Sequence, residues 1–397
     1  LAGANNLTIQ EFQQRQKRVA ADLSKAKEWW LPNLYAGTTF HQLWGNVMNG
    51  DGQIFTDVNR QNFWGGVGLN ANWDFGDGLF KVDAAEFNVQ AAAYETQAEK
   101  NKALLEVIQT YYDFLTAQLY YNAYQELIVR GDSIINQIAA QVDVELRFES
   151  ELLLAKSNQN RLKVEMLNAR TEYNDKSALL VKLLNLSPDI KLVSADAILA
   201  PLELVNIDEV QTPIDSAYAY RPELKSMEFT LKSLNAEKKT TTTGLWLPDL
   251  RVGTYGSYFG GVFSPLNPTR AVNAALIWEI PLGRIAYKGE LKQFDARISL
   301  QEIKMEQAKA TINEEVLRAK GRISTSKEQI DLALEGSQLA EQALSQSIAR
   351  QDLKIPRPFE IVQMQDVYIR SKLDYIKAVA TYNKAQYAYL VASGTDL

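Results

Sequence analysis

The string Trp-Leu-Pro-Asx-Leu occurs twice in this chain, at residues 30–34 and again at residues 246–250. Slightly more than half of the 397 residues separates the two copies. A repeated string of this kind predicts that one structural unit is present twice, and an internal repeat restricts the possible folds strongly. The two halves of the chain are therefore best compared element by element.

The first half has a polar helix, two strands around a long polar loop, a very long helix and a shorter returning helix. These elements are expected at residues 8–29, 33–44, 62–75, 79–147 and 151–186. Proline ends the first helix at Pro32, because it can neither donate a backbone hydrogen bond nor avoid a clash with the preceding turn. At about 1.5 Å per residue, the very long helix would span roughly 100 Å.

The second half repeats this order of parts. Its elements are expected at residues 222–243, 249–262, 271–281, 285–352 and 359–391. We interpret residues 1–198 as the first structural repeat and residues 199–397 as the second. In each repeat the long helix is about as long as the two shorter helices together, so that the shorter ones can lie end to end beside it.

The predicted strands have one apolar face and one polar face, as period-two alternation requires. In the second strand the apolar set is Phe63, Gly65, Val67, Leu69, Ala71 and Trp73, and the polar set is Asn62, Asn70, Asn72 and Asp74. Residues 271–281 alternate in the same way. A soluble β-sandwich would show the same alternation, so this pattern alone leaves a sandwich and a membrane sheet equally open.

The length of the strands and their tryptophans favour the membrane. All seven tryptophans lie in or beside the four strands, and aromatic residues gather at the membrane interfaces of outer-membrane barrels. We expect Trp44, Trp73 and Trp278 at such interfaces, with the barrel strands at residues 33–75 and 249–281. Four strands cannot close a barrel, and lipid does not tolerate open sheet edges. Three copies of the chain would supply twelve strands, whereas two would supply eight, a barrel nearly filled by side chains.

Composition argues against most enzyme classes. The net charge of −6 gives no basic footprint for nucleic acid. The chain has no cysteine and a single histidine, His41, which removes thiolate chemistry, disulfides and multi-histidine metal sites. We therefore expect no catalysis, no cofactor and no metal. No apolar run is long enough for a membrane-spanning helix, and the opening LAGANNL is interpreted as a processed or trimmed start.

Two short motifs weakly resemble ligand sites. GVGLNA at residues 66–71 matches a relaxed dinucleotide fingerprint, but strand alternation continues where that fingerprint needs a helix. NGDGQIFTD at residues 49–57 resembles a calcium loop, but Ile54 occupies the position that requires glycine. Both segments are expected to be ordinary strand and loop.

Four features of the chain together resemble the TolC-type outer-membrane efflux proteins, and the resemblance extends over essentially the whole chain. They are Arg221-Pro222-Glu223-Leu224, the two Trp-Leu-Pro strings, Phe75-Gly76-Asp77-Gly78 and Val144-Glu145-Leu146-Arg147. The resemblance implies an internally duplicated α+β membrane protein: four transmembrane strands per chain, a twelve-stranded barrel in a homotrimer, and an α-helical coiled-coil tunnel in the periplasm. It also implies an outer-membrane exit duct, served by a periplasmic adaptor and an inner-membrane pump of the RND, ABC or MFS type.

The resemblance assigns roles to residues beside the two helix breaks. The turns would dock the adaptor through Val144, Glu145, Leu146, Arg147, Ile355 and Pro356. Glu145 replaces a glycine of the family pattern, which implies a different adaptor. Glu151 and Arg357 match an acid and an arginine that hold the tunnel end shut. Glu360 matches an acid that rings the constriction, and Gln363 stands where a second ring acid is usual. An alternative for these charges is simple stabilisation of helix ends by the helix dipole.

Two functions from different classes remain open on the sequence. The first is the passive export duct, for small molecules in an efflux pump or for proteins in a type I secretion system. The second is a soluble coiled-coil structural or adhesin-like protein with β-sandwich caps. Dependence of solubility on detergent distinguishes them.

Overall fold

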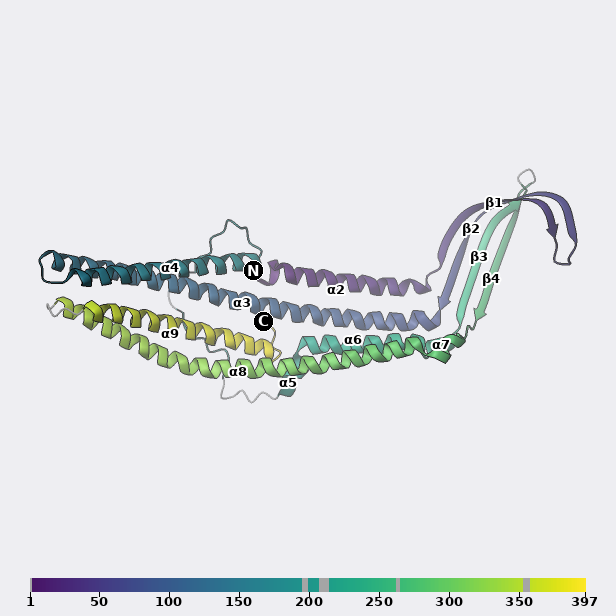
Figure 1. The fold of residues 1–397 in the computed structure, drawn as a ribbon. Helices are drawn as coiled ribbons and strands as arrows, with labels where there is room; N and C mark the ends of the chain where they lie inside the picture. Colours follow the sequence, from purple (N-terminus) through teal and green to yellow (C-terminus); the bar gives the residue numbers. More distant parts are fainter. Residues whose placement is uncertain (1, 195–198, 207–213, 262–264, 353–357) are drawn as a thin grey trace. The chain divides into compact units, whose positions relative to one another are not determined.

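The computed structural model describes residues 2–194, 199–206, 214–261, 265–352 and 358–397. The chain forms helices and one antiparallel sheet (Figure 1). The helices are α1 (Ala2–Asn5), α2 (Leu7–Ala26), α3 (Phe75–Asp143), α4 (Glu149–Leu183), α5 (Ile214–Tyr220), α6 (Pro222–Lys238), α7 (Leu282–Tyr287), α8 (Gly289–Asp352) and α9 (Pro358–Ala392). Short 3₁₀ turns are η1 (Lys27–Trp30), η2 (Lys239–Thr241) and η3 (Gly244–Trp246). The order of α2, β1, β2, α3, α4 recurs as α6, β3, β4, α7–α8, α9.

The chain divides into two compact units. One comprises Leu1–Gln14, Tyr94–Lys225 and Glu306–Leu397, and the other comprises Arg15–Ala93 and Ser226–Met305. Each unit draws on both halves of the sequence. We call the first the helical unit and the second the sheet unit. The repeat boundary near residue 198 stays a prediction.

The sheet contains β1 (Asn33–Met48), β2 (Ile54–Asp74), β3 (Asp249–Gly260) and β4 (Asn267–Ile277), paired in that order. All neighbours are antiparallel. The predicted loop between the first two strands is wrong, because the strands continue to a tight turn. Asn49 closes this turn: its side-chain oxygen accepts hydrogen bonds from the backbone N–H groups of Asp51 (3.1 Å) and Gln53 (2.8 Å). Polar side chains do not prevent ladder pairing, since the backbone supplies the bonds.

The last strand is displaced from its predicted position. It spans Asn267–Ile277 rather than residues 271–281, and it contains Pro268, paired with Tyr258. Proline is tolerated there because β4 is an edge strand, where one side needs no N–H donor. The predicted sheet segment 249–281 therefore ends at Ile277. The helix predicted from residue 285 is also divided: Lys288 adopts a left-handed conformation (φ 54°) between α7 and α8.

In the helical unit, α3, α4, α8 and α9 share successive apolar cores. The most deeply buried members of the middle cluster are Leu127, Leu162 and Leu344, each at most 1% exposed. The Arg-Pro-Glu-Leu motif anchors α6: Arg221 is 6% exposed and donates to Glu315 (2.9 Å) and to the backbone oxygen of Val391 (3.1 Å).

Two buried amides on α9 hold the extended segment at residues 200–205. Asn383 donates to the Ala200 oxygen (2.9 Å) and accepts from the Leu202 N–H (2.8 Å). Gln386 donates to the Leu202 oxygen (2.8 Å) and accepts from the Leu204 N–H (2.7 Å). The helical unit thus satisfies the polar backbone of this segment, as burial requires.

Candidate functional site

The sheet presents one apolar face of exposed side chains. Cross-strand pairing aligns Leu34 with Leu69, Leu69 with Thr254, and Thr254 with Val272, so these residues form one row on one face. The exposed large apolar residues of this face are Leu34, Phe40, Trp44, Val67, Leu69, Tyr258, Val272 and Leu276. The row Asn33, Asn70, Gly253 and Asn273 lies on the other face. An exposed apolar face backed by a polar one is the pattern of strands between lipid and a lumen.

The glycines of the sequence GVGLNA permit close packing within the sheet. A Cβ at Gly68 would come within 2.6 Å of the Tyr35 ring, and one at Gly66 within 2.6 Å of Ser257. The motif is therefore part of β2, as the alternation predicts, and has no phosphate-binding geometry.

The three predicted interface tryptophans occupy different environments. Trp44 is 68% exposed, on the same face of β1 as Phe40. Trp73 is half-buried, and its indole N–H donates to the Trp30 backbone oxygen (2.5 Å). Trp278 is 59% exposed but lies beyond β4. Its predicted position at the end of that strand is wrong, because Ile277 already pairs with Asp249, the first residue of β3.

The repeated Trp-Leu-Pro strings mark the two helix-to-strand junctions. After η1 the chain becomes extended at Leu31 (φ −81°, ψ 135°), and after η3 it becomes extended at Leu247 (φ −87°, ψ 143°). Trp29 covers Gly78 so closely that a Cβ there would lie 2.3 Å from the indole. At each string a helix ends and a strand begins. In the first copy, the preceding Trp29 packs directly against Gly78.

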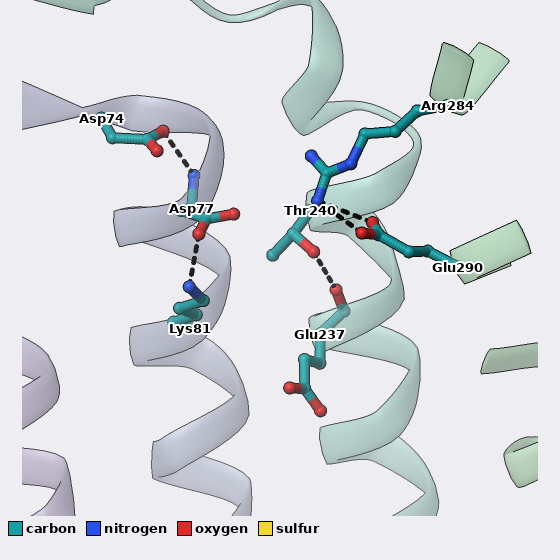
Figure 2. A network of polar contacts seen from close by, with 7 residues as sticks. All are labelled: Asp74, Asp77, Lys81, Glu237, Thr240, Arg284 and Glu290. Carbon is teal, nitrogen blue, oxygen red and sulfur yellow. Dashed lines mark hydrogen bonds and ion pairs between the residues drawn. The ribbon is translucent and has the colours of Figure 1, made fainter. Parts of the chain in front are cut away.

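Polar contacts stabilise the starts of α3, which follows β2, and of α8, which follows α7 (Figure 2). The Asp74 carboxylate accepts from the Asp77 backbone N–H (2.8 Å), and Asp77 is paired with Lys81. Arg284 and Glu290 form an ion pair (2.7 Å) across the left-handed residue Lys288. A carboxylate at a helix N-terminus satisfies orphan N–H groups, which is why α3 can begin directly after β2.

The turn between α3 and α4 exposes apolar side chains. Val144 is 62%, Leu146 65% and Phe148 78% exposed. Glu145 has φ 59°, a left-handed conformation that favours glycine. Ile355, Pro356 and Arg357 lie outside the described residues.

Arg147 differs from its exposed neighbours in this turn. It is 8% exposed, and its three guanidinium nitrogens have no hydrogen-bond partner among the described residues. Burial lowers the pKa of this guanidinium from its ordinary value, and the carboxylate of Glu151 partly opposes that effect. Arg147 therefore lies behind the exposed surface of the turn.

The predicted gate acids are placed as follows. Glu151 is half-buried in the first turn of α4. Glu360 accepts hydrogen bonds from Arg350 (3.1 Å) and Ser347 (3.3 Å) of α8, and Gln363 is exposed. The pairing of Glu151 with Arg357 stays a prediction, because the arginine is outside the described residues.

Sequence reasoning missed a polar bridge between α4 and α9. Arg161 pairs with Asp366 (2.8 Å) and donates to Asn158 (3.0 Å), and buried Asn158 donates to buried Gln365 (3.1 Å). Asp366 also pairs with Arg370 (2.8 Å). The partners are about two hundred residues apart in sequence, so no local spacing reveals them.

Residues 1–186 match the family model described as "Outer membrane efflux protein". The match covers slightly less than half of the 397-residue chain. The resemblance inferred from the sequence is thereby confirmed, and the predicted outer-membrane location agrees with the family's description. No match was found among curated protein sequences.

Solved structures share the fold of this chain over nearly its whole length. A membrane protein from Pseudomonas aeruginosa matches with a TM-score of 0.86 and 16% identity, over 99% of this chain and 91% of that one. The CmeC outer membrane channel of Campylobacter jejuni gives 0.82 and 16%, over 99% and 84%. The MtrE outer membrane channel of Neisseria gonorrhoeae gives 0.80 and 15%, over 100% and 88%. The fold class of four strands with long helices is confirmed. No described helix is apolar over a stretch long enough to cross a bilayer.

Proposed function

We propose that this efflux protein is one subunit of a homotrimeric outer-membrane exit duct that conducts substrates passively. The observation that carries the proposal is the exposed apolar face of a four-stranded sheet with two unpaired edges, β1 and β4. In lipid such edges must pair. Three subunits would join edge to edge into twelve strands, with the polar face toward the lumen and the apolar face toward lipid.

The helical unit supports a periplasmic tunnel in this proposal. Its four long helices pack through apolar clusters, and α4 and α9 are joined by Arg161 and Asp366. The turn at residues 144–148 would meet a periplasmic adaptor, because its exposed Val144, Leu146 and Phe148 need an apolar partner. The adaptor would connect the duct to an inner-membrane transporter of a tripartite efflux pump or a type I secretion system.

The soluble scaffold with β-sandwich caps receives less support. A sandwich buries the apolar face of one sheet against a second sheet. The described residues form a single sheet, and Leu34, Val272 and Leu276 on its apolar face are each more than half exposed. Exposed apolar area of this kind calls for lipid or another subunit.

The mass of the detergent-solubilised chain, measured by native mass spectrometry or light scattering, tests the proposal. We expect three copies per particle, together with loss of solubility when detergent is removed. A stable monomer in detergent-free buffer would overturn the duct and favour the scaffold. A well-behaved particle of two copies would retain the membrane location but reject the twelve-stranded barrel.

A further inference from the structure

A cavity of about 720 Å³ lies in the helical unit between α4 and the segment that follows it. Tyr121 of α3, Arg170 and Tyr173 of α4, and Ile190 and Lys191 of the following segment are among its lining residues. Its volume is in the range of small-molecule sites, which are mostly apolar with a few placed polar groups. It includes no residue of the gate or of the adaptor turn.

The charge of the lining has one sign. Arg170, Lys182 and Lys191 line the cavity, and no aspartate or glutamate does. None of the three makes an ion pair with any residue that the structure describes. The three side chains are exposed at the mouth and walls of the cavity. Because a cleft lined by one sign of charge raises the local concentration of the opposite ion, these three cations attract anions. This sets the cavity apart from the acidic chain as a whole, whose net charge is −6.

Partly buried hydrogen bonds hold the walls of the cavity in place. The Tyr173 hydroxyl donates to the Leu192 backbone oxygen (2.5 Å), and its ring stacks on Phe114 at 5.3 Å. The Gln118 side chain makes two hydrogen bonds with the backbone of Ser194. It donates to the oxygen (3.0 Å) and accepts from the N–H (2.9 Å). A ligand would therefore enter a preformed site and meet little ordering cost.

We propose that this cavity binds a ring-bearing organic anion. Arg170, Lys182 and Lys191 would meet the carboxylate or phosphate, and the tyrosine and aliphatic walls would cover the ring. The two tyrosines fit a ring, because a tyrosine side chain has a flat apolar face that can cover a ring and a polar hydroxyl at its tip. A sugar acid and an aromatic acid both have this chemistry, and the experiment separates them. The site is independent of the duct proposed above.

Isothermal titration of the full chain in detergent at low salt tests the proposal. The probes form two matched pairs, glucuronate against glucose and benzoate against benzyl alcohol, with inorganic phosphate as a ringless anion. We expect at least one ring anion to bind about tenfold or more tighter than its neutral partner and than phosphate, with an affinity that falls as salt rises. The pair that responds identifies the ring.

The variant Arg170→Gln/Lys191→Gln should lose about tenfold or more of that affinity. Lys156→Gln is the control, because Lys156 is an exposed cation of α4 that does not line the cavity. Circular dichroism should show that both variants keep their helices. Equal binding of the neutral and anionic partners, wild-type affinity in the double variant, or no binding up to about 10 mM ligand would each overturn the site. None of these results bears on the trimer mass, so failure here leaves the duct untouched.

Discussion

Gly76, where β2 passes into α3, and Gly244, between α6 and β3, touch back to back in the sheet unit. A Cβ on Gly76 would lie 2.5 Å from the Gly244 carbonyl oxygen, and one on Gly244 would lie 2.6 Å from the Gly76 oxygen. Gly76 follows β2 of the first repeat, and Gly244 follows α6 of the second. The junctions of the duplicated halves therefore meet through backbone alone, and no side chain fits between them.

Gly76→Ala should consequently destabilise the sheet unit. Overpacking against rigid backbone typically costs 1–3 kcal/mol, and we expect a lower thermal transition and a lower trimer yield. Gly283→Ala is the control, since a Cβ there meets nothing within 4 Å. Equal transitions for both variants would mean that the junctions separate without cost.

Charge should be tolerated on only one face of β4. Val272 lies on the apolar face and the adjacent Asn273 on the polar face. A lysine on the lipid face of a barrel costs up to about 2–4 kcal/mol at mid-membrane depth. We expect Val272→Lys to reduce membrane assembly, measured as folded trimer extracted from outer membranes, and Asn273→Lys to assemble normally. The reverse result would assign the two faces backwards.

In the turn at residues 144–148, we expect exposed side chains to contact the adaptor and the buried Arg147 to stabilise the turn itself. Leu146→Asp places a charge on an exposed apolar surface, so export should fall while trimer yield and thermal stability stay at wild-type values. Arg147→Glu alters a buried side chain and should lower both export and stability. Normal export by Leu146→Asp would exclude this turn as the docking surface.

The gate prediction concerns conductance in a planar bilayer. Glu151→Gln with Arg357→Ser should raise the low conductance of the closed duct, if these residues hold its end shut. Glu360→Gln should weaken cation preference, because rings of carboxylates favour cations. Arg350→Gln should strengthen that preference, since Arg350 now pairs with Glu360.

The exposed pair of Arg318 and Glu314 supplies the matched control, Arg318→Gln, which should conduct like wild type. If the Glu151 and Arg357 double variant also conducts like wild type, these residues are ordinary helix-end charges.

Stability of the helical unit should fall at high pH. Burial, with the neighbouring Tyr387 and Tyr111, raises the pKa of Tyr112 to about 12, and burial with nearby Asp374 raises that of Tyr120 to about 12. The unfolded tyrosines lose their protons near pH 10 and the folded ones near pH 12, so the unfolded state binds fewer protons between these values. The free energy of unfolding should therefore decrease from pH 10 to 12.

Denaturant titrations between about pH 10 and 12 measure how steeply the free energy of unfolding falls with pH. Tyr112→Phe should reduce this slope, although its stability at neutral pH is lower because its hydroxyl contacts are lost. Tyr287→Phe is the control, because Tyr287 is 82% exposed. An unchanged slope in Tyr112→Phe would place the alkaline loss in other groups.

Three features were predictable from the residues alone: the duplication, the order of the main elements and the faces of the strands. These follow from local chemistry: Pro32 ends a helix, alternation assigns Val67 and Asn70 to opposite faces, and helical periodicity persists over long segments. Local composition predicted the ends of two strands wrongly, because strand pairing extends through polar residues and proline. The polar residues at 54–61 belong to β2, and Pro268 lies inside β4, because strand ends depend on the partner strand rather than on the segment alone.

Contacts between residues far apart in sequence could not be predicted in this way. The contacts between Gly76 and Gly244, between Arg161 and Asp366, and between Gln118 and Ser194 join segments with no common local pattern. Burial also depends on contacts that the sequence does not show. Arg147 is a charged residue in a turn, where exposure is expected, and is nevertheless only 8% exposed. The physical reason is that local propensity acts over a few residues, whereas burial and side-chain pairing depend on packing between helices and strands that the chain brings together from far apart.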